Sequence, residues 1–223
     1  VILRNLGEVS GTAGFVTALS LVPLSVASAI LQATPLAVTL GAALVLGERV
    51  GWRRWSAILV GFFGVLLILR PGLAGFRPEA LFAVLGVAGL AVRDVASRAT
   101  PRRVSTLTLS IYAQAAILAL GVGLMAAGQR PAPVGLPEAA LLVAATVIGA
   151  GAYLALTEAM RSGDVSAIVP FRYSRLVFAL IIGIAILGER PDPATLTGAA
   201  MVVGSGLYTL ARERALAARG RRP

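Results

Sequence analysis

The chain has 223 residues, of which 57% are hydrophobic and only 13% charged, and its mean hydropathy is +0.87. These shares lie outside the range of soluble domains and are typical of a protein embedded in a bilayer. The absence of Cys and His excludes thiol chemistry and removes the commonest general base and metal ligand. The net charge of +10 does not predict a nucleic-acid partner, because the arginines stand at the ends of apolar runs rather than among residues that read bases.

Apolar segments long enough to cross a membrane follow one another along the chain. A crossing helix needs about 20 mainly apolar residues, and the 39 uncharged residues between Glu8 and Glu48 suit two helices, with Pro23 marking the turn. The predicted fold class is therefore all-α, a polytopic membrane helix bundle with short loops. Eight spans are predicted, at residues 4–22, 25–46, 52–70, 79–97, 104–128, 137–160, 165–187 and 193–211.

The arginines at the ends of the predicted spans and in the connections between them divide unevenly between the two sides of the bundle. Thirteen fall on one side and four on the other, and positive charge is retained in the cytoplasm. We expect a multi-pass protein of the inner (cytoplasmic) membrane with a cytoplasmic C-terminus. The thirteen are Arg4, Arg49, Arg53, Arg54, Arg98, Arg102, Arg103, Arg161, Arg212, Arg214, Arg219, Arg221 and Arg222, and the four are Arg70, Arg77, Arg130 and Arg190.

The tetrapeptide LGER occurs twice, at residues 46–49 and 187–190, and each copy closes the second of three consecutive spans. The offset of 141 residues contains five spans. Because five is odd, the second copy enters the membrane from the opposite side, as in the inverted repeats of secondary transporters. Only five of 25 positions match between residues 25–49 and 166–190, so a chance likeness of small-residue helix ends stays open.

The stretches "ATPLAVTLGAALVLGERVGWRRWSAILVGFFGVLLILRPG" (33–72) and "SAIVPFRYSRLVFALIIGIAILGERPDPATLTGAAMVVGSGLY" (166–208) resemble the EamA-like transporters of the drug/metabolite transporter superfamily. The resemblance implies ten helices in two inverted five-helix repeats. Residues 1–72 would be the last three helices of the first repeat, and the family's first two helices are expected to be absent. Residues 73–212 would be the second repeat, and 213–223 a basic cytoplasmic tail.

Two arginines lie near the middle of the predicted span 165–187. Arg172 and Arg175 are three residues apart and so share one helical face, and each costs about 2.5–3.5 kcal/mol at the bilayer centre. Such residues point into the bundle or into a wet cavity. With Tyr173 and Ser174 beside them, they are predicted to bind an anionic or carboxylate-bearing substrate at the membrane midplane.

Acidic residues elsewhere in the spans offer an alternative for these arginines. Either Glu158 or Asp94 would pair with them and hold the bundle together. Glu158 also lies three residues from Arg161, which favours a surface ion pair over a proton-coupling role. Asp94 and Arg98 have the i,i+4 spacing of a salt bridge at a helix end.

The remaining polar candidates lie on two other spans. Gln32 and Thr34 precede Pro35, where a kinked helix would expose them to the central cavity, although plain hydrogen bonding between helices would explain them equally well. Tyr153 and Thr157 recur at helical spacing on the span before the arginine pair. They are further candidates for substrate binding.

Glycine marks expected packing faces and helix ends. Gly7 and Gly11, and the GFFG stretch at 61–64, predict close helix packing within the bundle or contacts between copies, so monomer and homodimer both stay open. In LGER, the glycine permits the helix to end. The Glu of each copy is expected at the membrane interface, with a gating ion pair as the alternative.

The sequence favours a carrier over the other classes of membrane protein. Only three Asp are present, none is paired at mid-span, and no cofactor or metal is expected, so no enzyme is predicted. The prediction is a secondary-active transporter of small organic metabolites, such as amino acids, vitamins or nucleoside-like compounds, working by alternating access. A channel-like facilitator and a non-transporting scaffold or receptor are the alternatives.

Overall fold

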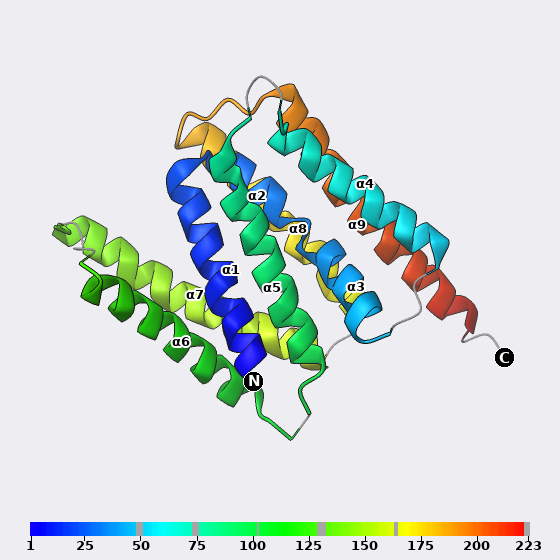
Figure 1. Ribbon diagram of the computed structural model, residues 1–223, viewed down its shortest axis with the longest axis horizontal. Helices are drawn as coiled ribbons and strands as arrows, with labels where there is room; N and C mark the ends of the chain where they lie inside the picture. The colour runs from blue at the N-terminus through cyan, green and yellow to red at the C-terminus, as the bar shows by residue number, and fades with distance from the viewer. Residues whose placement is uncertain (48–50, 73–75, 102, 129–132, 163–164, 221–223) are drawn as a thin grey trace.

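The computed structural model describes residues 1–47, 51–72, 76–101, 103–128, 133–162 and 165–220. For residues 106, 156–162, 165–172, 213–214 and 216–220 it describes the backbone alone. The described chain is a bundle of helices joined by short connections (Figure 1). In chain order the helices are α1 (Ile2–Leu21), α2 (Leu24–Leu31), α3 (Thr34–Val45), α4 (Trp52–Leu69), η1 (Pro78–Ala80), α5 (Leu81–Arg98), α6 (Thr106–Ala126), α7 (Leu136–Ser162), α8 (Val165–Ala185) and α9 (Pro193–Gly220).

The helices follow the eight predicted spans closely, which confirms the all-α fold class. Six segments of the described chain are long and apolar enough to cross a membrane: Leu24–Val45, Trp52–Leu69, Pro78–Arg98, Leu107–Ala126, Leu136–Ala155 and Pro193–Arg212. The other two predicted spans correspond to α1 and α8. Helix α1 carries Arg4 and Glu8, and the apolar part of α8 is the shorter stretch Tyr173–Ala185.

The second predicted span is not one helix but two, because the first helix ends at Leu31 and the next begins at Thr34. Pro35 has no N–H to donate to the carbonyl of Leu31, as a continuous helix would require. The hydroxyl of Thr34 donates to that carbonyl instead, at 2.6 Å. The N–H of Ala33 bonds to Ile30 O at 3.0 Å, a tighter turn that ends α2. The expected kink is a tight turn of two residues, Gln32 and Ala33, which keep helical backbone angles, and it separates two half-helices, α2 and α3.

Glycines bring two pairs of helices into backbone contact. Helices α1 and α5 lie side by side in Figure 1, and a Cβ added at Gly7 would meet Gly89 O and Arg93 N at 2.7 Å. Helices α4 and α9 run antiparallel along each other (Figure 1), where a Cβ at Gly64 would meet Gly198 O at 2.7 Å. The prediction that these glycines serve packing within the bundle is confirmed.

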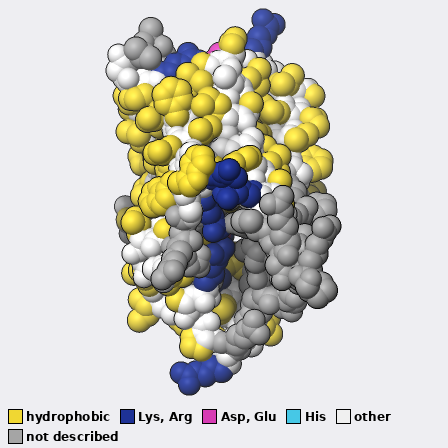
Figure 2. Space-filling view, turned by 90° about the vertical axis from the view of Figure 1, so that its right-hand side faces the viewer, with side chains coloured by type: hydrophobic (Ala, Val, Ile, Leu, Met, Phe, Trp, Pro, Cys, Tyr) yellow, Lys and Arg dark blue, Asp and Glu magenta, His cyan; other side chains and the backbone are white. Residues whose placement is uncertain are grey.

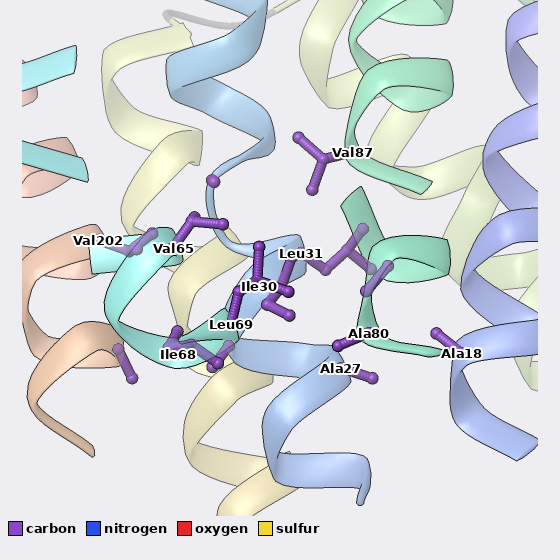
Figure 3. Close-up of a cluster of buried hydrophobic side chains, with 14 of the residues drawn as sticks. Ala18, Ala27, Ile30, Leu31, Val65, Ile68, Leu69, Ala80, Val87 and Val202 are labelled. Carbon is purple, nitrogen blue, oxygen red and sulfur yellow. The ribbon is translucent and has the colours of Figure 1, made fainter. Parts of the chain in front are cut away.

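The apolar core gathers around the half-helix α2. Ile30 and Leu31 are fully buried there, and Figure 3 shows them beside Val65, Ile68 and Leu69 of α4. Apolar side chains also cover much of the outer face in Figure 2, while basic side chains occur in separate groups. A large exposed apolar surface would be an aggregation hazard in water, but it is the surface a bilayer requires.

Candidate functional site

The break between α2 and α3 brings a polar side chain against α8. Gln32 is the C-cap of α2 and is only 3% exposed. Its Nε2 donates to the backbone carbonyl of Tyr173 at 3.1 Å. Its Oε1 faces Nη2 of Arg175 at 3.5 Å, the long limit of a hydrogen bond. The break therefore joins two of the predicted site residues, Gln32 and Arg175.

The guanidinium group of Arg175 has an aromatic neighbour as well. Its central carbon lies 5.9 Å from the centre of the Phe15 ring on α1, within the range of a cation–π contact. The side chain of Arg175 is nevertheless exposed. A positive charge that is oriented by Gln32 and Phe15 but still accessible has the properties of an anion-binding group.

Among the other residues predicted at this site, Tyr173 and Thr34 are buried. Tyr173 is 5% exposed, and its ring lies against α9, where a Cβ at Gly206 would collide with the hydroxyl. Ser174 is exposed. Thr34 is 1% exposed and is already engaged with its own helix. Arg172 belongs to α8, but its side chain lies outside the described atoms.

A second polar cluster, which we call the charged network, lies between α1, α5 and α7. Glu8 is its centre and is 4% exposed. Its Oε1 accepts from Nη1 of Arg93 at 3.2 Å, and its Oε2 accepts from the hydroxyl of Tyr153 at 2.8 Å. Arg93 also contacts Asp94 at 2.8 Å. Arg4 approaches Glu8 at 3.9 Å and donates to the Tyr153 hydroxyl at 2.7 Å.

Arg4 extends the charged network to α6. Its Nη1 donates to the carbonyl of Leu109 at 3.0 Å, and its Nε donates to Ser97 at 3.1 Å. Two arginines face two carboxylates, so the network is electrically balanced, which makes the burial of Arg4 and Glu8 and the partial burial of the other two charges tolerable. The network thus fastens α1 to three other helices.

The charged network corrects the interpretation of Arg4 and adds a partner for Asp94. The sequence places Arg4 among the loop arginines, but Arg4 is 2% exposed within the bundle. Glu8 compensates its charge there, and the Tyr153 hydroxyl accepts a hydrogen bond from it. Asp94 was paired with Arg98, and its described ion-pair partner is Arg93. The side chains of Thr157 and Glu158, also predicted as site residues, lie outside the described atoms.

Sequence reasoning missed Arg93 and Glu8 as functional candidates. Arg93 lies five residues inside α5 and Glu8 six residues inside α1. Charged residues at such depth are uncommon and mark sites by default, so their position in apolar spans was a usable signal. Among the described residues, no group of three or more His, Cys, Asp or Glu could hold a metal ion.

A cavity of about 340 Å³ opens at the end of the bundle where α2 begins. The second LGER copy contributes to it. The carboxylate of Glu189 accepts hydrogen bonds from the backbone N–H of Leu24 at 2.5 Å and of Ser25 at 3.0 Å. Glu189 is therefore not simply an interfacial charge, because it caps α2. The lining includes Pro23, Ser25, Arg70, Arg77, Glu189 and Arg190.

The loop beside this cavity is fixed by Asp192, the residue before α9. Its Oδ1 accepts from the N–H of Ala194 and Thr195, at 2.9 and 3.0 Å, and its carboxylate pairs with Arg70. Partial burial opposes ionisation of Asp192, but the hydrogen bonds from Thr195 and the charge of Arg70 outweigh it and hold its pKa below the ordinary value. Glu48 of the first LGER copy lies outside the described residues.

Known proteins resemble the chain along most of its length. The EamA-like transporter family model matches residues 6–70 and 77–211. The S-adenosylmethionine uptake transporter of Rickettsia bellii is 30% identical over 213 residues, covering 96% of this chain and 72% of that protein. The riboflavin transporter of Rhizobium johnstonii is 29% identical over 218 residues, covering 96% of this chain and 69% of that protein.

A solved crystal structure shares the fold. It is 24% identical with a TM-score of 0.61, and the match covers 92% of this chain and 75% of that one. The family match runs through the apolar segments found above. The chain belongs to the EamA-like transporter family of the drug/metabolite transporter superfamily and is a transporter rather than an enzyme.

Proposed function

We propose that the protein carries a small organic metabolite with a carboxylate or other anionic group, by alternating access around the α2–α3 break. The observation that carries this proposal is Arg175, held beside Gln32 at the break and still exposed. Helix breaks inside membrane proteins free backbone groups to bind substrate or ions, and they mark the binding sites of many secondary transporters.

The two ends of the bundle support alternating access because a separate set of contacts holds the helices together at each end. The charged network ties α1 to α5, α6 and α7 near the N-terminus of α1. Glu189 ties α2 to the loop after α8 at the end where α2 begins. Contacts of this kind can open in turn, so that the site at the break faces one side at a time.

The arginine distribution and the helix directions support an orientation and an inverted repeat. Placing the arginine-rich side in the cytoplasm puts the charged network near the cytoplasm and the Glu189 cavity on the outside. The antiparallel course of α4 and α9 (Figure 1) is what equivalent last helices of two inverted repeats would have. Removing buried Arg4 from the count leaves twelve loop arginines against four, and the asymmetry persists.

The relatives suggest which substrates to try first. S-adenosylmethionine carries an amino-acid carboxylate, whereas riboflavin carries none, so the two compounds separate the role of charge from that of ring shape. If Arg175 binds a carboxylate, its loss should impair transport of S-adenosylmethionine more than transport of riboflavin. The alternative that the protein is a channel-like facilitator predicts no accumulation above the outside concentration.

The test is uptake of labelled S-adenosylmethionine and riboflavin into proteoliposomes of the purified protein, with and without a pH gradient. Arg175→Ala is expected to lower uptake of the carboxylate-bearing compound roughly 10- to 100-fold, the effect of losing one charged hydrogen bond. The matched control is Arg53→Ala, because Arg53 is an exposed arginine that stacks on Trp52 at the start of α4. Equal uptake by both variants and the unmodified protein would overturn the role of Arg175.

A further inference from the structure

The beginning of α2 lacks a cap from its own sequence. Pro23 precedes the helix and contributes no side-chain hydrogen bond, so the first N–H groups of α2 need an acceptor from elsewhere. Glu189, more than 160 residues along the chain, supplies it through both carboxylate oxygens. A carboxylate is thus already bound at the positive end of the half-helix.

Ser25 shows that this carboxylate does not satisfy the whole site. Its side chain is 1% exposed and lines the cavity, yet its hydroxyl has no hydrogen-bond partner among the described residues. A buried hydroxyl without a partner is costly. A carboxylate that entered more deeply than that of Glu189 would accept from the Ser25 hydroxyl as well as from the two N–H groups.

The charges around the cavity also favour an incoming anion. Arg70, Arg77 and Arg190 line it, against the carboxylates of Glu189 and Asp192. Arg70 is paired with Asp192, while Arg77 and Arg190 form no ion pair within the described part of the chain. Three arginines and two carboxylates give the cavity a net positive charge. When the carboxylate of Glu189 moves out of the cavity, that net charge rises by one.

We propose that the start of α2 is an outer carboxylate-binding site in which Glu189 is a built-in occupant that exchanges with the carboxylate of an arriving substrate. Exchange would release the loop after α8 from α2. The link to a transported carboxylate rests on the proposed function, whereas the site itself rests on the bound Glu189 group and the unpartnered Ser25 hydroxyl.

The first experiment is rescue of Glu189→Ala by acetate, measured as the melting temperature of the detergent-purified protein in sodium acetate against sodium chloride of equal ionic strength. The variant should melt about 2–4 °C lower, and acetate but not chloride should restore the loss, since a ligand of the native state stabilises it. Ser25→Ala in the same background should raise the acetate concentration needed for half-maximal rescue several-fold. Glu79→Ala is the matched control, because Glu79 is an exposed carboxylate at the same end of the bundle; it should show neither loss nor rescue.

Glu189→Gln provides a second measurement that does not depend on the folding of Glu189→Ala. The amide keeps one acceptor and removes the charge, so it should weaken the cap without emptying the site, and acetate should raise its melting temperature less than it raises that of Glu189→Ala. No acetate-specific stabilisation in either variant would overturn the binding site.

The second experiment tests exchange in the protein with Glu189 intact. The chain has no Cys, so spin labels can be placed at Leu21→Cys and Leu187→Cys, both exposed positions on either side of the contact. Acetate, but not chloride, should lengthen the distance between the labels, and Glu189→Ala should show the long distance without acetate. A distance unchanged by acetate at concentrations that rescue Glu189→Ala would overturn exchange and leave Glu189 as a fixed cap. Neither experiment needs transport, so their failure is distinguishable from failure of the proposed function.

Discussion

The hydroxyl of Tyr153 lies 2.8 Å from Oε2 of Glu8, although 145 residues separate them in the chain. Glu8 accepts at the same time from Arg93, so one carboxylate joins α1, α5 and α7. Removing its charge would leave buried Arg4 without the carboxylate that it faces, and Arg93 would keep Asp94 alone.

Glu8→Gln is therefore expected to be among the most destabilising single substitutions in the protein. Breaking a buried ion pair by removing one partner costs about 3–5 kcal/mol, whereas Tyr153→Phe removes one hydroxyl and should cost about 1 kcal/mol. The measurement is unfolding in detergent followed by circular dichroism. Glu138→Gln, at an exposed glutamate in the first turn of α7, serves as the control, and an equal loss in Glu8→Gln and Glu138→Gln would contradict the role of the network.

Gln32→Leu should impair both stability and transport. The change removes the donor to the Tyr173 carbonyl and the acceptor that faces Arg175. The Tyr173 carbonyl lies within α8 and keeps its bond inside the helix, so the loss of the hydrogen bond from Gln32 should cost about 1 kcal/mol. Arg175 would also lose part of its orientation. Uptake in proteoliposomes, corrected for the amount of folded protein, should fall. Full activity of the folded fraction would show that Gln32 is a structural residue alone.

Two glycines on α9 predict opposite outcomes for the same substitution. A Cβ at Gly198 would collide with Gly64 O and Ile68, whereas a Cβ at Gly204 would meet nothing within 4 Å. Gly198→Ala should destabilise the protein by about 1–3 kcal/mol, and Gly204→Ala should be neutral or stabilising because Ala favours the helix. Thermal unfolding of the two variants side by side is the measurement. A destabilised Gly204→Ala with an unaffected Gly198→Ala would mean that α4 and α9 pack differently.

The loop before α9 should lose stability in acid. The folded-state pKa of Asp192 is depressed below 3.8. The stability that its ionised carboxylate contributes is therefore present above that pH and is lost as the pH falls through the folded pKa. Because the side chain is 47% exposed, the ion pair itself adds at most about 1 kcal/mol. Asp192→Asn should keep the helix cap and flatten the acid dependence of the melting temperature. Asp192→Ala should lower the free energy of unfolding by about 1 kcal/mol more, because it also removes the cap. Identical acid profiles of Asp192→Asn and the unmodified protein would argue against this assignment.

Single cysteines can test the proposed orientation, again because the chain has none of its own. In intact cells, a membrane-impermeant maleimide should label Glu79→Cys, beside the outer cavity, but not Arg103→Cys, which lies in the connection between α5 and α6. Both positions are exposed, so both should react after the cells are broken. The reverse pattern in intact cells would invert the orientation.

Much of the fold could be predicted because a bilayer allows few solutions. Apolar runs set the helix positions, and Pro23 and the short loops set the turns. The break at Gln32 was expected only as a kink, since it depends on Thr34 taking the carbonyl that Pro35 leaves. The charged network could not be assembled from the sequence, because Arg4, Arg93 and Tyr153 come from three helices with no spacing relation. In addition, the i,i+4 spacing of Asp94 and Arg98 predicts a local ion pair, whereas the contact of Asp94 with the adjacent Arg93 follows no such spacing rule.

The half-helix α2 has only eight residues, a length of about 12 Å, and it is attached at both ends to one stretch of chain. Glu189 binds its first turn, and the Tyr173 carbonyl binds Gln32 at its last. While both attachments hold, α2 and α8 should therefore move as one rigid body. If the hydrogen bonds of Glu189 to α2 break, the Gln32–Tyr173 hydrogen bond remains as a pivot. A small tilt of α2 at the outer surface would then rotate the side-chain amide of Gln32 that faces Arg175.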